Sequence, residues 1–279
     1  MNGTTSTEPG VWGVQSIIDP DIDLYTIDAL RDNFVWAAGD SGKVYYYNGT
    51  VWEETQTPAT EKINDLKIIS ENDIWMVGNE GVFHFNGSIW AQPAGSPTTT
   101  CYCFDYANSN EIWVGSTSGS IWYYNGSAWI ESQVSGDRID DIQINTESDG
   151  AVVDWNGKVY IYNGYSWSLL CEASGYYYCL EYLSTNDIWL GECYYGRIAH
   201  WDGNMFNYFS SNIYDIFDIG FINSDLVWFV GENGYIYYWD GSEITSVESS
   251  TNNDINSVIM ISSSDGWAAG DGGVVLRYH

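Results

Sequence analysis

Short apolar segments separated by turn residues repeat along the whole chain. In the second copy of this pattern they lie at Ile63–Ile69, Ile74–Gly78, Val82–Phe85 and Ile89–Gln92. Short segments rich in Ile, Val, Tyr and Trp are typical of β-strands. Asn-Gly or Asp-Gly pairs stand between the third and fourth segments of most copies. These pairs favour the positive φ angles of a tight hairpin, so each copy is predicted to form four antiparallel strands.

The pattern returns with a period of about 38 residues, and seven copies can be recognised. The glycine that ends the second segment marks six of them, at Gly39, Gly78, Gly115, Gly191, Gly231 and Gly270. The fourth copy is degenerate and lacks this glycine. Four-stranded units at such a period are the blades of a β-propeller. The sequence therefore predicts an all-β, seven-bladed propeller that spans residues 1–279 as a single domain.

The two ends of the chain predict how the ring closes. The seventh copy stops at His279, after its third segment, and lacks the fourth. A matching segment with a Trp lies at the other end of the chain, in Pro9–Gln15. Residues about 10–17 are therefore expected to supply the outer strand of the last blade, which removes a free sheet edge.

Aromatic residues recur at fixed places in the repeat and indicate packing. One repeat position holds Trp36, Trp75, Trp113, Trp189, Trp228 and Trp267. A residue type required in nearly every blade is expected to pack between blades. These positions explain the fold and say little about function.

Departures from the repeat indicate a candidate site. In the fifth copy the turn after the second strand is long and carries two tyrosines, and in the fourth copy it carries a Trp. The connection into the fifth copy carries Tyr176, Tyr177 and Tyr178, the last of which either joins them or is buried in its strand. In an up-and-down blade, these connections lie on one face. The patch expected on blades four and five consists of Trp155, Tyr176, Tyr177, Tyr194 and Tyr195.

Exposed aromatic rings beside carboxylates and amides suit two kinds of ligand. Sugar rings stack their C–H faces on aromatic side chains while polar neighbours bind the hydroxyls. Protein contact surfaces are also rich in Tyr and Trp. The main prediction is a non-catalytic carbohydrate-binding propeller with a glycan partner, and the alternative is a protein-interaction or assembly scaffold. An enzyme acting on polysaccharide is the third hypothesis.

The charge balance narrows the choice of partner. The chain has 8 Lys and Arg against 38 Asp and Glu, a net charge of −30. Nucleic acids and anionic membrane surfaces require basic residues, so neither is an expected partner. No apolar run approaches transmembrane length. Acidity, few lysines and five cysteines favour an extracellular or cell-surface location.

The cysteines suggest one disulfide. Antiparallel pairing in the fifth copy places Cys193 next to the partner of Cys179, so a Cys179–Cys193 disulfide is predicted. A zinc site is the competing interpretation, but no CxxC pair or nearby His supports it. The odd number of cysteines leaves at least one unpaired, unless it bridges two chains.

Three further motifs carry two interpretations each. Asn48, Asn86 and Asn125, like Asn2, begin Asn-Gly-Ser/Thr sequences that either bear N-glycans or simply form turns. Aspartates of the innermost strands (Asp65, Asp141 and Asp218) either hold a cation or accept hydrogen bonds from backbone amides. The run Asp19–Asp23 either begins a calcium loop or forms a solvated acidic linker; it lacks the Gly and Glu of such a loop, so the linker is favoured and no cofactor is expected.

The residues typical of an active site do not form a recognisable set. The chain has three His, of which His84 and His200 share a repeat position and His279 is terminal. No nucleophile motif or metal-ligand spacing accompanies them. Glycoside hydrolysis needs only two carboxylates, which this acidic chain has in excess. The sequence thus predicts no catalytic residues and no metal site.

The repeat resembles that of a known group of propellers. Ser262–His279 (SSSDGWAAGDGGVVLRYH) carries a GWAAGxxG core that Phe34–Gly42 and Asp73–Gly81 share. This core resembles the repeat of photosystem II assembly-factor-like propellers, within the wider bacterial neuraminidase (BNR) repeat group. That group continues with a Thr-x-Asp-Gly-Gly-x-Thr-Trp turn, whereas this chain has Asn-Gly-x-x-Trp. The resemblance implies a non-catalytic binding propeller.

Overall fold

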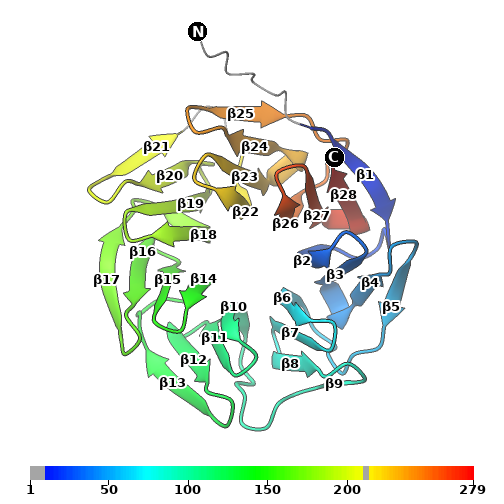
Figure 1. Cartoon of the computed structure of the whole chain (residues 1–279), viewed down its shortest axis with the longest axis horizontal. Helices are drawn as coiled ribbons and strands as arrows, with labels where there is room; N and C mark the ends of the chain where they lie inside the picture. Colours follow the sequence, from blue (N-terminus) through cyan, green and yellow to red (C-terminus); the bar gives the residue numbers. More distant parts are fainter. Residues whose placement is uncertain (1–9, 210–213) are drawn as a thin grey trace.

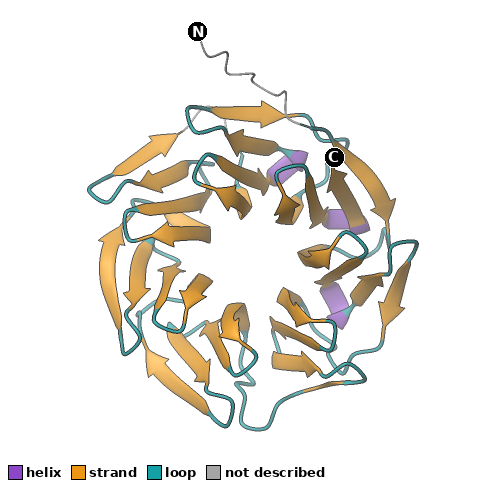
Figure 2. Ribbon diagram, viewed as in Figure 1, coloured by secondary structure: helices purple, strands orange, loops and turns teal. Residues whose placement is uncertain are grey.

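The protein is a ring of seven four-stranded antiparallel sheets around a central opening (Figures 1 and 2). The computed structural model describes residues 10–209 and 214–279. Each sheet is one blade. In blades 1–6 the strands follow the chain from the centre of the ring to the outside, and in blade 7 the N-terminal strand is outermost. The seven-bladed prediction is confirmed.

The strands of the first four blades are as follows. Blade 1 consists of β2 (Leu24–Arg31), β3 (Phe34–Gly39), β4 (Val44–Tyr47) and β5 (Trp52–Thr55). Blade 2 consists of β6 (Ile63–Ser70), β7 (Asp73–Gly78), β8 (Gly81–Phe85) and β9 (Trp90–Ala91). Blade 3 consists of β10 (Cys101–Asn108), β11 (Glu111–Ser116), β12 (Ser120–Tyr124) and β13 (Trp129–Gln133). Blade 4 consists of β14 (Ile139–Thr146), β15 (Asp149–Asp154), β16 (Lys158–Tyr162) and β17 (Trp167–Glu172).

The remaining blades complete the ring. Blade 5 consists of β18 (Tyr176–Ser184), β19 (Asp187–Cys193), β20 (Ile198–Trp201) and β21 (Phe206–Phe209). Blade 6 consists of β22 (Ile216–Asn223), β23 (Leu226–Gly231), β24 (Ile236–Trp239) and β25 (Ile244–Val247). Blade 7 consists of β26 (Ile255–Ser262), β27 (Asp265–Gly270), β28 (Val274–Tyr278) and β1 (Trp12–Ile17). Short 3₁₀ turns lie at η1 (Asp40–Gly42), η2 (Glu232–Gly234) and η3 (Asp271–Gly273), and no helix in the described residues is long and apolar enough to cross a membrane.

The N-terminal strand closes the ring, as predicted. β1 pairs antiparallel with β28, from Trp12 opposite Tyr278 to Ile17 opposite Val274 (Figure 1). The side chain of Trp12 is fully buried. Its ring centroid lies 5.2 Å from that of Tyr278 and 5.7 Å from that of Trp228 in blade 6. The strand therefore both covers the free edge of β28 and packs the seventh blade against the sixth.

The repeated aromatic residues pack between blades. The ring of Trp36 in blade 1 lies 5.6 Å from Phe85 and 6.0 Å from Trp90 in blade 2. Trp267 in blade 7 contacts Tyr47 and Trp52 in blade 1 in the same way, at 5.3 and 6.1 Å. Such pairs stabilise a core beyond the apolar area that they bury.

A side chain of the third strand covers this Trp in several blades. In blade 2, His84 stacks on Trp75 at 4.2 Å, and its Nε2 lies 2.8 Å from Oδ1 of Asp73. In blade 7, Arg277 lies 4.7 Å from the ring of Trp267 and pairs with Asp265. Burial alone would raise the pKa of Asp73, but hydrogen bonds from His84, Ser109 and Trp75 lower it below its ordinary value.

Replacing this carboxylate tests its contribution to stability. We expect Asp73→Asn to lower the free energy of unfolding at pH 7 by roughly 1 kcal/mol, because the hydrogen bonds favour the ionised form. A lowered native pKa stabilises the fold above the unfolded-state pKa, and this stabilisation is lost as the pH falls through the native pKa. The difference in unfolding free energy between Asp73→Asn and the unmodified protein, measured by urea denaturation, should therefore be smaller at pH 3 than at pH 7. The exposed Asp32→Asn is the matched control, and an equal loss in both variants would contradict this account.

Candidate functional site

The inner strands line the central opening with polar side chains that join neighbouring blades. One repeat position of these strands holds Thr26, Asp65, Cys103, Asp141, Cys179, Asp218 and Ser257. The carboxylates of Asp65, Asp141 and Asp218 accept the amide N–H of Phe104, Leu180 and Val258 in the next blade, at 3.0, 2.7 and 2.8 Å. Of the two interpretations, hydrogen bonding to backbone amides is therefore confirmed for these three aspartates.

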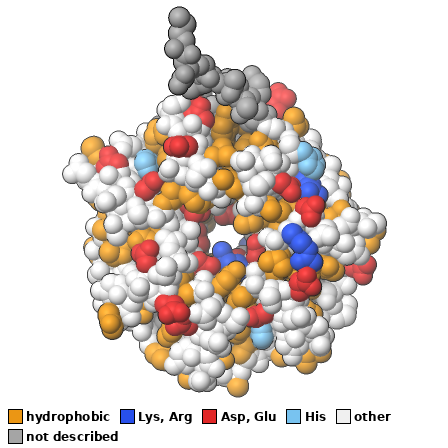
Figure 3. All heavy atoms as spheres, viewed as in Figure 1, with side chains coloured by type: hydrophobic (Ala, Val, Ile, Leu, Met, Phe, Trp, Pro, Cys, Tyr) orange, Lys and Arg blue, Asp and Glu red, His pale blue; other side chains and the backbone are white. Residues whose placement is uncertain are grey.

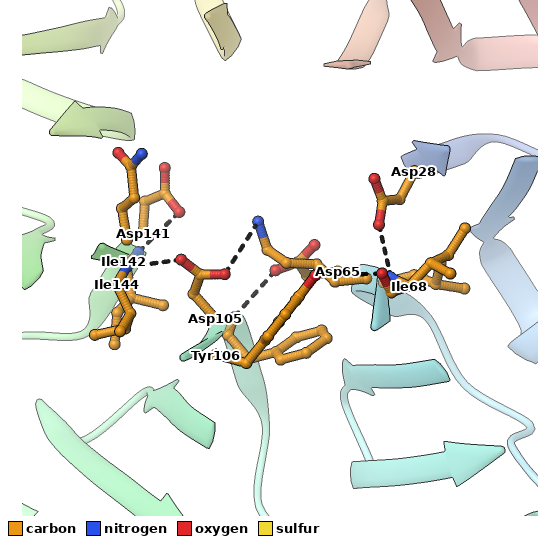
Figure 4. Close-up of polar contacts among 12 residues, drawn as sticks. Asp28, Asp65, Ile68, Asp105, Tyr106, Asp141, Ile142 and Ile144 are labelled. Carbon is orange, nitrogen blue, oxygen red and sulfur yellow. Dashed lines mark hydrogen bonds and ion pairs between the residues drawn. The ribbon is translucent and has the colours of Figure 1, made fainter. Parts of the chain in front are cut away.

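A second set of bridges lies two residues further along the inner strands. Asp28 accepts the N–H of Ile68, and Asp105 accepts the N–H of Ile144, both at 2.6 Å. Figure 4 shows these carboxylates and their amide partners on successive inner strands. Burial, the largest cause, raises the pKa of Asp28 and of Asp218 to about 6 and that of Glu181 to about 8.

Lys67 places a cation among the bridging carboxylates of this channel. Its Nζ lies 3.9 Å from Oδ1 of Asp105 (Figure 4). Burial alone would lower the pKa of Lys67, but Asp105, Asp65 and Asp141 raise it well above its usual value. Acidic side chains surround the opening in the space-filling view, with a Lys or Arg side chain inside it (Figure 3). The channel cavity has a volume of about 770 Å³.

Removing this cation should make stability depend more strongly on pH. The buried carboxyl groups have raised native pKa values, so the fold loses stability as the pH rises from the unfolded-state pKa through the native one. Without the ammonium this loss should be larger, and we expect Lys67→Met to destabilise the protein by about 2 kcal/mol at pH 8. The loss should be smaller at pH 5. Thermal unfolding at both pH values measures the loss of stability in Lys67→Met, and the surface ion-pair variant Lys43→Met is the control. An equal loss at pH 5 and pH 8 would contradict a stabilising role of the Lys67 charge.

The aromatic residues expected on blades 4 and 5 form a cluster around Trp155. The Trp155 ring lies 5.3 Å from Tyr176, 5.6 Å from Tyr178 and 6.1 Å from Tyr194. Cζ of Arg138 lies 4.1 Å from the same ring. Trp155 is therefore enclosed by its neighbours and organises the cluster. The exposed rings are Tyr176 and Tyr194, of which 41% and 64% are accessible.

The other two predicted residues lie outside this cluster. Tyr195 is 71% exposed, and its ring lies 5.9 Å from Cζ of Arg197. Tyr177 is fully buried, and its hydroxyl donates to the carbonyl of Ser174. Alternation along β18 explains the difference, because Tyr176 and Tyr178 point to one side of the sheet and Tyr177 to the other. Tyr177 is thus a core residue and does not form part of an exposed patch.

Tyr194 has a strained backbone. Its φ is +75°, a conformation that a bulky residue rarely adopts. The corresponding turns of other blades place Ser41 and Asn233 at φ of 56° and 57°. The carboxylate of Asp215 accepts the amide N–H of Tyr194 and so helps to hold it. Strain of this kind, combined with an exposed aromatic ring, is typical of a functional position.

The strain predicts that Tyr194 lowers the stability of the fold. We expect Tyr194→Gly to raise the free energy of unfolding by about 1 kcal/mol, because glycine adopts positive φ without steric cost. Tyr195→Gly, one residue further on, should not stabilise the protein. Urea denaturation of the two variants beside the unmodified chain is the measurement. A Tyr194→Gly variant less stable than the unmodified protein would contradict the inferred strain.

Sequence reasoning missed several residues of this face. Tyr102, Arg138 and Phe217 surround the channel mouth together with Tyr178. The repeat could have revealed them, because the residue that precedes the repeat position of Thr26 and Asp65 can be identified in every blade. That position holds Tyr25, Asn64, Tyr102, Asp140, Tyr178, Phe217 and Asn256.

The predicted Cys179–Cys193 disulfide is wrong. Two register shifts in the β18–β19 ladder, between Tyr182 and Ser184 and between Tyr177 and Cys179, place Cys179 opposite Gly191 and Cys193 opposite Tyr176. All five cysteines are free thiols, and Cys193 donates to the carbonyl of Tyr176 at 3.3 Å. Within residues 10–209 and 214–279, no group of three or more His, Cys, Asp or Glu is placed to hold a metal ion.

The asparagines of the predicted glycosylation sites form the hairpin turns. Oδ1 of Asn48 accepts the amides of Thr50 and Val51, and Asn86 and Asn125 make the same bonds at their own tips. The Asn-Gly pairs therefore have a structural reason of their own. Asn2 lies outside the described residues.

These features define a class: a seven-bladed β-propeller with an acidic, hydrogen-bonded channel and an aromatic mouth. No family model and no curated protein sequence matches the chain. Among solved structures, it is similar to YCF48 from Cyanidioschyzon merolae, with 17% identity, a TM-score of 0.76 and coverage of 96% of this chain and 98% of that one.

Two other structures have the same fold. YCF48 bound to D1 peptide gives 15% identity and a TM-score of 0.78, over 98% of this chain and 97% of that one. The computationally designed Ika8 protein gives 10% identity and a TM-score of 0.70, over 98% and 100%. Because YCF48 is a photosystem II assembly factor, the resemblance noted in the repeat is confirmed. At these identities the likeness establishes the fold.

Proposed function

We propose that this chain is a non-catalytic propeller that binds a segment of another protein on the face where the inner strands begin. The observation that carries the proposal is the exposed aromatic cluster of Tyr176 and Tyr194 around Trp155, beside the channel mouth. A rigid ring holds these rings in place, and the strained turn at Tyr194 presents its side chain to solvent. Preorganised aromatic side chains are common anchors of protein interfaces.

The structural neighbours favour a protein partner over a glycan. One of them is YCF48 bound to D1 peptide, so this propeller fold is known in a peptide complex. The carbohydrate-binding prediction draws no corresponding support from the neighbours. We therefore place the protein-binding alternative first. The extracellular or cell-surface location rests on composition alone and stays a prediction.

Selection from a peptide library tests the proposal. The immobilised protein is screened against phage-displayed random peptides, and each enriched peptide is remeasured by fluorescence anisotropy. We expect peptides that bind the unmodified protein and lose about tenfold or more in affinity for Tyr176→Ala/Tyr194→Ala, because the two exposed rings of the cluster are removed.

The matched control is Tyr165→Ala. Tyr165 is 94% exposed on a hairpin tip, at the opposite face of the ring from Tyr194, so its loss should leave peptide binding unchanged. A glycan array is run in parallel. Failure to enrich any peptide would overturn the proposal, and glycan binding that Tyr176→Ala/Tyr194→Ala abolishes would in that case favour the carbohydrate prediction.

A further inference from the structure

The residues at the channel mouth form a ring, called here the rim, with one member from each blade. The rim consists of Tyr25, Asn64, Tyr102, Asp140, Tyr178, Phe217 and Asn256. Four of these seven are aromatic, in blades 1, 3, 5 and 6. Because the blades are equivalent, the surroundings of each aromatic member can be compared position by position.

In blades 1 and 3 the chain places its own cation on the rim aromatic. Nζ of Lys62 lies 3.1 Å from the ring centroid of Tyr25, and Cζ of Arg138 lies 4.7 Å from that of Tyr102. Each cation belongs to the next blade and stands two residues before the rim member of that blade. Such contacts are favourable because the face of an aromatic ring is electron-rich.

Carboxylates accompany both internal cations. Arg138 donates through Nε and Nη2 to Oδ1 of Asp140, at 2.8 and 2.5 Å. Burial lowers the pKa of Lys62 below its ordinary value, and the nearby carboxylates of Asp40, Asp271 and Asp23 oppose this shift. The rim thus contains two stations, each made of an aromatic ring, a cation and at least one carboxylate.

Blades 5 and 6 have the ring and the carboxylate without the cation. The position that holds Lys62 and Arg138 is occupied by Asp215 in blade 6 and Asp254 in blade 7. The rings of Tyr178 and Phe217 lie 5.9 Å apart at 61°. In the part of the chain that the structure describes, no Lys or Arg lies over either ring. The guanidinium of Arg138 faces the rings of Tyr102 and Trp155, and Arg138 acts on the Tyr178 hydroxyl through its charge without covering that ring.

Negative charge accumulates at this third station. Burial raises the pKa of Asp215, and the neighbouring Glu232, Glu192 and Asp254 raise it further, against the hydrogen bond from the Tyr194 amide. Glu192 is paired with Arg197, whereas no ion pair of Asp215 or Asp254 occurs among the described residues. An additional cation here would complete the arrangement found in blades 1 and 3.

We propose that the third station, formed by Tyr178, Phe217 and Asp215, binds a Lys or Arg side chain of the partner segment. This inference rests on the proposed function and specifies the chemistry of the partner. A cation at this station lies beside Tyr194, so the exposed aromatic cluster and the station form one continuous binding surface. The net charge of −30 adds long-range attraction for a basic segment.

The probe is a fluorescein-labelled peptide of four arginines alternating with glycines, compared with the same peptide in which citrulline replaces arginine. Citrulline keeps the shape of arginine and removes its charge. Fluorescence anisotropy at 150 mM salt should show binding of the arginine peptide and at least about tenfold weaker binding of the citrulline peptide. Asp215→Asn/Phe217→Leu should weaken arginine-peptide binding by about fivefold or more, in the range expected for a cation–aromatic contact with a carboxylate.

The matched control makes the same chemical changes at a station that is already filled. Asp40→Asn/Tyr25→Leu alters the overall charge equally, and we expect less than a twofold change in affinity. Equal losses in both double variants would mean that only long-range attraction acts, and would overturn the inference. Unfolding curves of both variants, recorded by circular dichroism, verify that each remains folded.

The two proposals fail in different ways. Selected peptides that bind the exposed aromatic cluster but lack Lys and Arg, and that are indifferent to Asp215→Asn/Phe217→Leu, would overturn the third station and leave the proposed function intact. Binding of the arginine probe that is weakened by Asp215→Asn/Phe217→Leu but unchanged in Tyr176→Ala/Tyr194→Ala would leave the cation site and overturn the role that the proposed function gives to the exposed aromatic cluster.

Discussion

The structure depends on one repeated interaction, the hydrogen bond from an inner-strand side chain to a backbone amide of the next blade. Asp28, Asp65, Asp105, Asp141 and Asp218 each make it. Ladder hydrogen bonds hold strands together only within a blade, so these bonds and the aromatic contacts fix each blade relative to its neighbour. Carboxylates suit the task because a charged acceptor forms a stronger hydrogen bond than a neutral one.

Joining the blades through carboxylates brings like charges close together, and their repulsion determines the chemistry of the channel. Acidic side chains from successive blades converge on a narrow space, and burial favours their neutral forms. Lys67 offsets part of this repulsion from within. Its presence explains how a propeller can use so many channel aspartates as structural acceptors. The acidic channel is therefore a consequence of how the blades are joined.

The repeat made the fold predictable, whereas the strand register within each blade limited prediction of the site. The Asn-Gly and Asp-Gly pairs, the repeat period and the missing last strand were sufficient to predict seven blades and closure by β1. Tyr177 was misplaced because a strand alternates its side chains, so that neighbours in sequence face opposite sides. The Cys179–Cys193 pairing failed because the register of β18 and β19 shifts twice, between Tyr182 and Ser184 and between Tyr177 and Cys179. The same shifts recur between the first two strands of every blade, but the residues at these positions differ from blade to blade and so give no common sequence signal.

The repeat also separates residues that serve the fold from those free to serve a ligand. A bridging position must accept an amide hydrogen bond, so its side chains are restricted to short acceptors in most blades. The rim position next to it carries no such requirement and varies from Asn64 to Phe217. Where it is aromatic, the chain covers it with a cation in blades 1 and 3 and leaves it open toward carboxylates in blades 5 and 6. Since the open half lies beside the strained turn of Tyr194, one sector of an otherwise uniform ring carries both the exposed rings and the unbalanced charge that a basic partner requires.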